Sequence, residues 1–239
     1  TDSCGACPSC KKMNNIGHPD VHFTFPIHLS QTKKTTISDD VLGDFRDMLF
    51  QDIYIGKNQW YQFLGNENKQ GVIGTKESQS IIRKLSLKSY EGEYKVLIMW
   101  LTETMNSHAS NKLLKIIEEP PDKTLFLLVS DNPENIATTI LSRTQRLEVP
   151  SLKQSEVVDY LVDNKKVEKN KAHYISQLSN GNLHKALMIL KDKEEDHLIY
   201  FVEWMRLCYM RNISDTIDWV DKIASIGRES QKNFLIFTL

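Results

Sequence analysis

The sequence predicts an α/β protein in which a parallel sheet carries helices on both faces and an all-helical part follows. Two apolar runs, Val96–Leu101 and Leu125–Val129, alternate with helical patterns up to about residue 150. Such alternation is typical of parallel sheets joined by right-handed crossovers. From Ser151 onward only helical spacing occurs. The 239 residues are enough for one large domain or for two to three small ones.

Local patterns predict the elements before the first apolar run. Ser38 can cap a helix because its hydroxyl accepts an unpaired backbone N–H, and two aspartates in the first turn suit the helix dipole. Residues 53–73 are rich in glycine and aromatic residues, which predicts loop with one or two short elements. The expected elements are a strand over 21–25 and helices over about 38–50 and 76–89.

The two apolar runs are unbroken, the pattern of strands that are covered on both faces. Helical spacing from Met105 to Ile117 lies between them, and Pro120 ends that helix because the residue before a proline is pushed out of the α region. Pro133 suits the first position of a further helix. The expected elements are strands over 96–101, 125–129 and 145–149, and helices over 105–117 and from Pro133 to about Leu141.

We expect three domains. Residues 1–150 would form the α/β domain with a cysteine-rich module at 4–20, residues 151–193 a small helical domain, and residues 194–239 the start of another helical domain. Gly181 would end one helix of the middle domain. The chain begins without methionine inside a cysteine cluster and stops in an apolar run, so we interpret it as a piece of a longer protein. The helices expected after residue 150 cover about 153–164, 169–179, 183–192, 195–211 and 214–226.

Composition excludes several classes of protein. Hydrophobic residues make up 40% and charged residues 26% of the chain, which is typical of a globular protein rather than a disordered, collagen-like or coiled-coil one. No run approaches the roughly 18 apolar residues of a membrane span, and no leader opens the chain. We therefore expect a cytoplasmic protein without a membrane partner. A net charge of −1 gives no overall attraction to DNA, so any DNA contact would be local or made through a partner.

The cysteines Cys4, Cys7 and Cys10 stand at a spacing that lets their thiolates converge on one Zn²⁺ ion. Three ligands leave a fourth open, which could be His18 or a cysteine upstream of residue 1. With one ligand missing, this piece of chain could be metal-free, and three free thiols are the alternative. Cys208 lies in a helical pattern and is expected to be a core residue.

Two further segments carry little chemistry on physical grounds alone. Residues 111–121 form an amphipathic helix with a proline stop, and Arg143 follows a helix, where an arginine is usually a solvated surface residue. Yet the segments Asn111-Lys112-Leu113-Leu114-Lys115, Glu118-Glu119-Pro120-Pro121 and Ser142-Arg143 together closely resemble the bacterial DNA polymerase III clamp loader. The cysteine cluster before His18-Pro19-Asp20 resembles the zinc module of that family. The resemblance covers about residues 4–190.

The resemblance implies AAA+ subunits with an α/β nucleotide-binding domain, a small helical lid and a helical collar that makes a pentameric ring. In this family Arg143, with Ser142 before it, would act as an arginine finger on ATP bound by the neighbouring subunit. The phosphate loop of the family precedes the cysteine module, so it would lie before residue 1. The implied partners are the gamma/tau and delta subunits, the sliding clamp indirectly, and primer–template DNA through the complex.

The departures from the family favour a subunit that does not hydrolyse ATP. Trp100 stands where motor subunits have an aspartate, and His184 stands where their lid has an arginine. A histidine is mostly neutral at pH 7 and is a poor permanent partner for phosphate. We therefore expect a non-hydrolytic, delta-prime-like subunit that supports loading of the sliding clamp onto primed DNA. The alternatives are a gamma/tau-type ATPase motor and a stand-alone zinc-binding interaction module.

Overall fold

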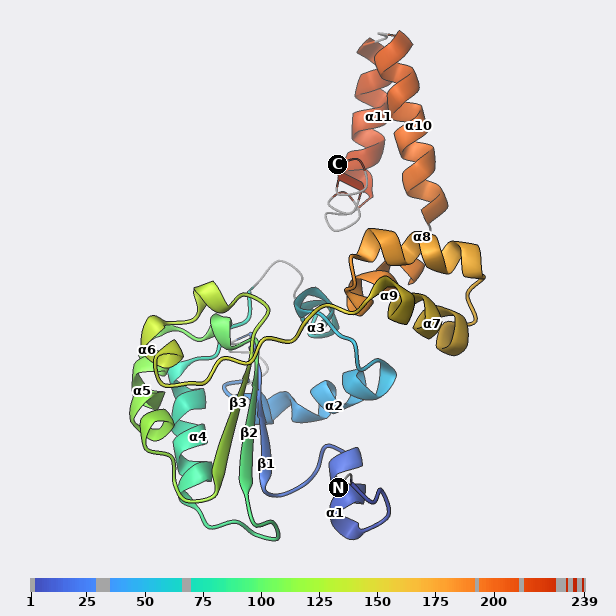
Figure 1. The fold of residues 1–239 in the computed structure, drawn as a ribbon. Coiled ribbons are helices and arrows are strands. Elements are labelled where there is room, and N and C mark those ends of the chain that lie inside the picture. The colour runs from blue at the N-terminus through green and yellow to red at the C-terminus, as the bar shows by residue number, and fades with distance from the viewer. Residues whose placement is uncertain are drawn as a thin grey trace. The chain divides into compact units, whose positions relative to one another are not determined.

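The computed structural model describes residues 3–28, 35–65, 70–191, 194–210 and 213–226, and residues 231, 234, 235 and 238. The chain divides into two compact units, Thr1–Glu148 and Val149–Leu239. Figure 1 traces their elements in chain order. The expected α/β class with a helical C-terminal part is confirmed. The boundary expected between residues 193 and 194 falls beside residues 192–193, which lie outside the described residues.

The sheet of the first unit has three parallel strands in the order β1-β2-β3. Val96 of the central strand is paired with Val21 on one side and with Leu125 on the other. Leu97 and Met99 point to one face of this strand and are fully buried. A central strand of this kind appears in the sequence as an apolar run because both neighbours and a helix layer cover it. The strands are β1 (Val21–Thr24), β2 (Lys95–Trp100) and β3 (Thr124–Val129).

One face of the sheet is covered by three helices, α4 (Thr75–Ser86), α5 (Ser107–Glu118) and α6 (Thr138–Leu141). Leu97, Ile81 and Leu113, from the sheet and two of these helices, meet in one buried core. Helix α5 begins after Asn106, whose side-chain oxygen accepts the N–H of Ala109 at 2.8 Å. This cap satisfies one of the donors that every helix start leaves unpaired.

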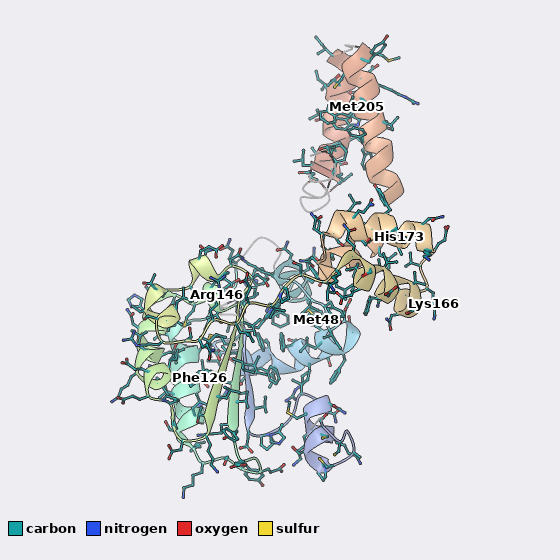
Figure 2. All side chains as sticks on the ribbon, in the orientation of Figure 1. Met48, Phe126, Arg146, Lys166, His173 and Met205 are labelled. Carbon is teal, nitrogen blue, oxygen red and sulfur yellow. The ribbon has the colours of Figure 1, made fainter. Side chains whose placement is uncertain are left out.

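The other face packs against α2 (Leu42–Gln51) and α3 (Lys57–Phe63). Helix α2 corresponds to the helix expected over about 38–50, and α3 is a short element within the region expected to be mostly loop. Phe25 stacks on Phe45 with ring centroids 4.0 Å apart, and Trp60 meets both rings edge-on. The Trp60 indole N–H donates to the Pro26 carbonyl at 2.8 Å, so the buried polar tip is satisfied. Met48 and Phe126, which contribute to the two cores, are labelled in Figure 2.

Short elements complete this unit. They are the helix α1 (Pro8–Asn14) and the 3₁₀ turns η1 (Ser38–Val41), η2 (Thr102–Thr104) and η3 (Pro133–Asn135).

Two expectations about strands are wrong. Residues 145–149 form no strand, and Leu147 and Val149 are 85% and 83% exposed. Their alternating pattern fits a strand, but a strand needs a hydrogen-bonded neighbour, and none of the described strands pairs with them. Strand β3 is not buried on both faces either, since Leu125, Leu127 and Val129 are exposed. It is an edge of the described sheet, and the packing on that face involves residues of β1 and β2.

The second unit begins with three helices that share a core, α7 (Gln154–Lys165), α8 (Lys169–Ser179) and α9 (Leu183–Lys191). Gly181 follows α8 with a φ of +76°, a left-handed conformation that glycine adopts without strain. A Cβ atom at this position would lie 2.2 Å from the Leu152 carbonyl oxygen. Helix α8 itself ends at Ser179, before Gly181, because its C-cap Asn180 already has a left-handed φ of +50° and Gly181 continues the turn.

The helices α10 (Glu194–Met210) and α11 (Ile213–Ser225) pack on each other. Trp204 stacks on Trp219 with centroids 6.2 Å apart, and Lys222 pairs with Glu203 at 2.9 Å. Cys208, expected in the core, is exposed on α10. The expectation was wrong because helical spacing of apolar residues does not guarantee burial in α10, where large apolar side chains such as Tyr209 are also exposed. Among the described residues, no helix is both long and apolar enough to cross a bilayer.

Candidate metal centre and interface arginine

The three N-terminal cysteines gather at the start of α1. Their sulfur atoms all lie within 4.8 Å of one another. Cys7 is the N-cap of the helix, and its sulfur accepts the N–H of Cys10 at 3.4 Å. Cys4 accepts the N–H of Cys7 in the same way at 3.4 Å. The spacing of two residues between cysteines therefore places all three sulfurs on one side of a tight turn, as the sequence predicts.

The geometry of this group fits zinc. The sulfurs of Cys4 and Cys10 are 3.7 Å apart, and a tetrahedral zinc ion with bonds of about 2.3 Å separates its sulfur ligands by about 3.8 Å. The backbone N–H of Cys7 is the main cause that lowers the pKa of Cys4 to about 7, which favours the thiolate that zinc requires. Cys4, Cys7 and Cys10 can thus supply three ligands, and a fourth would come from another group.

His18 does not supply that fourth ligand in this structure. Its Nε2 atom is 3.0 Å from the Ser9 hydroxyl, and its Nδ1 atom accepts the N–H of Asp20 at 3.2 Å. The metal-binding group found among the described residues contains the three cysteines and not His18. His18 instead ties α1 to the chain that leads into β1.

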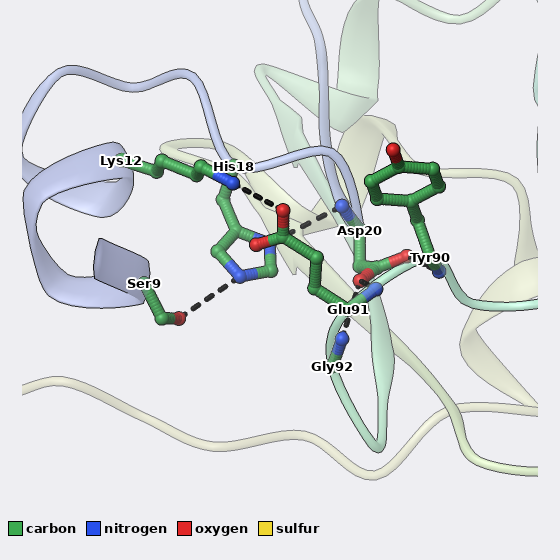
Figure 3. A network of polar contacts seen from close by, with 7 residues as sticks. All are labelled: Ser9, Lys12, His18, Asp20, Tyr90, Glu91 and Gly92. Carbon is green, nitrogen blue, oxygen red and sulfur yellow. Dashed lines mark hydrogen bonds and ion pairs between the residues drawn. The ribbon is translucent and has the colours of Figure 1, made fainter. Parts of the chain in front are cut away.

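Asp20 connects the cysteine module to the loop that precedes β2 (Figure 3). Its buried carboxylate accepts the backbone N–H groups of Tyr90, Glu91 and Gly92 at 2.5, 2.8 and 2.6 Å. Burial by itself raises the pKa of Asp20, but these three donors outweigh it and bring the pKa below its usual value. Lys12 on α1 forms an ion pair with Glu91 of the same loop.

We expect Asp20→Asn to destabilise the protein by about 3 kcal/mol at pH 7, because the amide NH₂ group cannot accept the N–H groups that the carboxylate accepts. A carboxylate with a lowered pKa contributes stability above its unfolded pKa of about 3.9, and the contribution is lost as the pH falls through the lower folded pKa. Urea unfolding of both proteins at pH 7 and pH 3 measures this. An equal difference in stability at the two pH values would contradict the role given to Asp20.

Trp100, at the carboxyl end of the central strand, belongs to an apolar cluster. Its ring centroid is 5.8 Å from that of Phe45 on α2. Glu103, the acidic residue that follows, accepts the N–H of Asp131 at 3.3 Å from beyond the end of β3. The carboxyl end of the central strand thus carries an aromatic side chain packed on its neighbours, and the nearby carboxylate of Glu103 is engaged by a backbone N–H.

His184 lies in the first turn of α9 in the second unit. Asn182 caps this helix, with its side-chain oxygen accepting the N–H of Lys185 at 2.9 Å. His184 is thus part of a regular helix start that Asn182 caps. Trp100 belongs to the first unit and His184 to the second.

Arg143 follows α6, and its backbone N–H donates to Ile140 at 3.0 Å. Its side chain donates from Nε to the carboxylate of Glu118 at 2.8 Å and from Nη1 to the Thr139 carbonyl at 3.0 Å. The Ser142 hydroxyl donates to the same carbonyl at 3.2 Å and lies 3.3 Å from Nη1. The structure therefore brings Ser142 and Arg143 together and adds Glu118, which no separate feature of the sequence marks as a partner.

Comparison with known proteins assigns the chain to a family. Residues 1–153 match the family described as "DNA polymerase III, delta subunit". The DNA polymerase III subunit delta' of Bacillus subtilis is 24% identical over 193 residues, which cover 81% of this chain and 45% of that protein. The corresponding subunit of Buchnera aphidicola is 29% identical over 140 residues, covering 59% of this chain and 31% of that protein.

The DNA polymerase III subunit tau of Bacillus subtilis is also similar, with 26% identity over 181 residues that cover 66% of this chain and 32% of the relative. The chain thus spans between 31% and 45% of the length of these relatives. The family match covers more than half of the chain, and the clamp-loader resemblance of its motifs is confirmed. The chain belongs to the DNA polymerase III delta subunit family.

Proposed function

We propose that the chain is part of a non-hydrolytic, delta-prime-like subunit of the DNA polymerase III clamp loader, which supports ATP-dependent loading of the sliding clamp onto primed DNA. The observation that carries this proposal is the packing of Trp100 against Phe45 at the end of the central strand. ATP hydrolysis needs acidic groups near that strand end to hold Mg²⁺ and orient water. An indole can do neither.

The proposed active contribution of the subunit is Arg143, which acts in trans. Its side chain is 32% exposed and is held beside Ser142, so it can meet a ligand bound by another subunit. A guanidinium directed at a γ-phosphate stabilises the charge that develops during phosphoryl transfer. ATP would then be bound by neighbouring subunits, and this chain would supply the arginine.

The remaining assignments follow the same proposal. Cys4, Cys7 and Cys10 would hold a structural zinc ion. Residues 1–150 would be the AAA+ α/β domain, residues 151–193 the lid and residues 194–239 the start of the collar. The gamma/tau and delta subunits would be the direct partners, with the clamp and primer–template DNA met through the complex in the cytoplasm.

A second candidate is a gamma/tau-type ATPase motor. The observation that favours it is the 26% identity to a tau subunit over 181 residues. The two candidates differ in the isolated protein, because a motor has its own phosphate loop and catalytic carboxylate. The packing of Trp100 therefore argues for the first candidate.

Omission of the subunit tests the proposal. Clamp loading onto primed DNA is measured with gamma/tau and delta subunits alone and after the full-length form of this protein is added. We expect loading to depend on the addition, and the isolated full-length protein to show no ATPase activity. Loading at the full rate without the protein would contradict the proposal, while ATP turnover by the isolated protein would favour the motor.

A further inference from the structure

The guanidinium of Arg143 is fixed on two of its three nitrogen atoms. Nε donates to Glu118 at 2.8 Å, the length of a good charge-assisted hydrogen bond, and Nη1 donates to the Thr139 carbonyl at 3.0 Å. Together these contacts hold both the position and the plane of the group. Among the contacts of the described residues, none involves Nη2, which leaves two N–H donors for a ligand outside the chain.

The place of Glu118 explains why the contact forms. Glu118 is the last residue of α5, and α5 packs on α6, after which Arg143 follows. The C-terminal end of a helix carries partial negative charge, which favours a cation beside it. The carboxylate of Glu118 adds a full negative charge at the same point. These charges therefore attract the edge of the guanidinium that carries Nε toward the end of α5.

The pair is not a structural necessity for the fold. The side chains of Glu118 and Arg143 are 56% and 32% exposed. Ion pairs at this exposure contribute little to stability because water competes for both groups. A contact that fixes an arginine while adding little to the fold is better explained by what the arginine does.

We propose that Glu118 is a positioning residue for Arg143, a role that rests on the proposed function of Arg143 as an arginine finger. By holding Nε, Glu118 keeps the guanidinium in the orientation that offers Nη2 to the γ-phosphate of ATP on the neighbouring subunit. An arginine without this contact has to be ordered at the moment of reaction. Preorganisation of a charged group before the transition state removes that cost.

The experiment measures ATP hydrolysis by the reconstituted loader in the presence of clamp and primed DNA. The loader contains one of four full-length subunits: the wild type, Glu118→Ala, Glu118→Gln or Glu119→Gln. Glu119 is the matched control, because it is the adjacent exposed carboxylate and has no contact with Arg143 in the described structure. Glu118→Ala is expected to lower kcat at the site that Arg143 serves, measured in single turnover, about fivefold, which is the upper end of what one exposed ion pair contributes. Glu118→Gln, which keeps an acceptor oxygen, should lose less, and Glu119→Gln should match the wild type.

A double variant separates positioning from a general defect. If Glu118 acts through Arg143, Glu118→Ala should cause no further loss when it is added to Arg143→Ala. An additive loss in the double variant, or wild-type kcat for Glu118→Ala while Arg143→Ala is slow, would overturn the positioning role and leave the function of Arg143 intact. No effect of Arg143→Ala would instead mean that the proposed arginine-finger role, on which this inference rests, itself fails.

Discussion

Full-length protein is expected to contain about one zinc ion per chain, and Cys7→Ser is expected to abolish this zinc content. Serine is a poor zinc ligand, but it caps helices well, so it can replace Cys7 as the N-cap of α1. The substitution therefore removes a metal ligand while the start of the helix is kept. Elemental analysis of the purified proteins measures the result directly.

The expected effect is large because little else holds the module. Helix α1 has seven residues and none of them is buried. An isolated helix of this length is unstable in water. The contacts that tie the module to the rest of the unit are polar, such as the ion pair between Lys12 and Glu91 and the hydrogen bond from Arg46 Nε to the Ile16 carbonyl at 2.8 Å. Zinc bound to a small module contributes on the order of 10 kcal/mol to its folding.

Loss of zinc should therefore expose the module to proteolysis. Trypsin can cleave after Lys11 and Lys12 once α1 unfolds, so chelation and Cys7→Ser should both accelerate cleavage there. Cys208→Ser is the matched control, because Cys208 is an exposed cysteine on α10 in the other unit. It should retain both zinc and protection. Full-length protein that is metal-free and yet resists cleavage at these lysines would contradict the zinc module.

Much of the fold could be predicted because hydrophobic periodicity reports burial directly. The central strand and the helices α4 and α5 all showed the expected spacing, since each buries a full face in the core. The strand predicted over residues 145–149 is absent because an alternating apolar pattern reports a local preference and does not show whether a partner strand is available. Lys95 is buried and donates to the carbonyls of Leu85 and Leu87 at the end of α4, a tertiary contact that a lone lysine beside an apolar run does not indicate.

The candidate site was predictable to a different degree at each residue. Cys4, Cys7 and Cys10 converge because two-residue spacings act within one turn. The family resemblance pointed to Arg143, whereas physical reasoning alone placed it among solvated residues. Glu118 and Asp20 could not be assigned their contacts, because their partners lie 25 and about 70 residues away along the chain. Such pairs depend on how the strands and helices meet, which local patterns do not specify.

Arg143→Ala is expected to slow ATP hydrolysis by the assembled loader by about 10³-fold at the site that Arg143 serves, the lower end of the range for arginine fingers. The guanidinium has two donors on Nη2 that no contact of the described residues uses, and alanine removes both together with the charge. The fold should be kept, because the substitution removes only a partly exposed ion pair and its neighbouring hydrogen bonds. Arg143→Lys should recover little, since an ammonium cannot satisfy Glu118 and a phosphate in the same planar geometry.

The most direct test of whether Arg143 acts in trans is the ATPase rate of the reconstituted loader with clamp and primed DNA. The loader is assembled once with the wild-type full-length subunit and once with its Arg143→Ala variant. Sites served by other subunits set a background, which single-turnover measurements on the neighbouring site separate. We expect the alanine variant to assemble normally and to lose turnover at that site. Equal single-turnover rates for the two proteins in intact complexes would show that Arg143 is not an arginine finger.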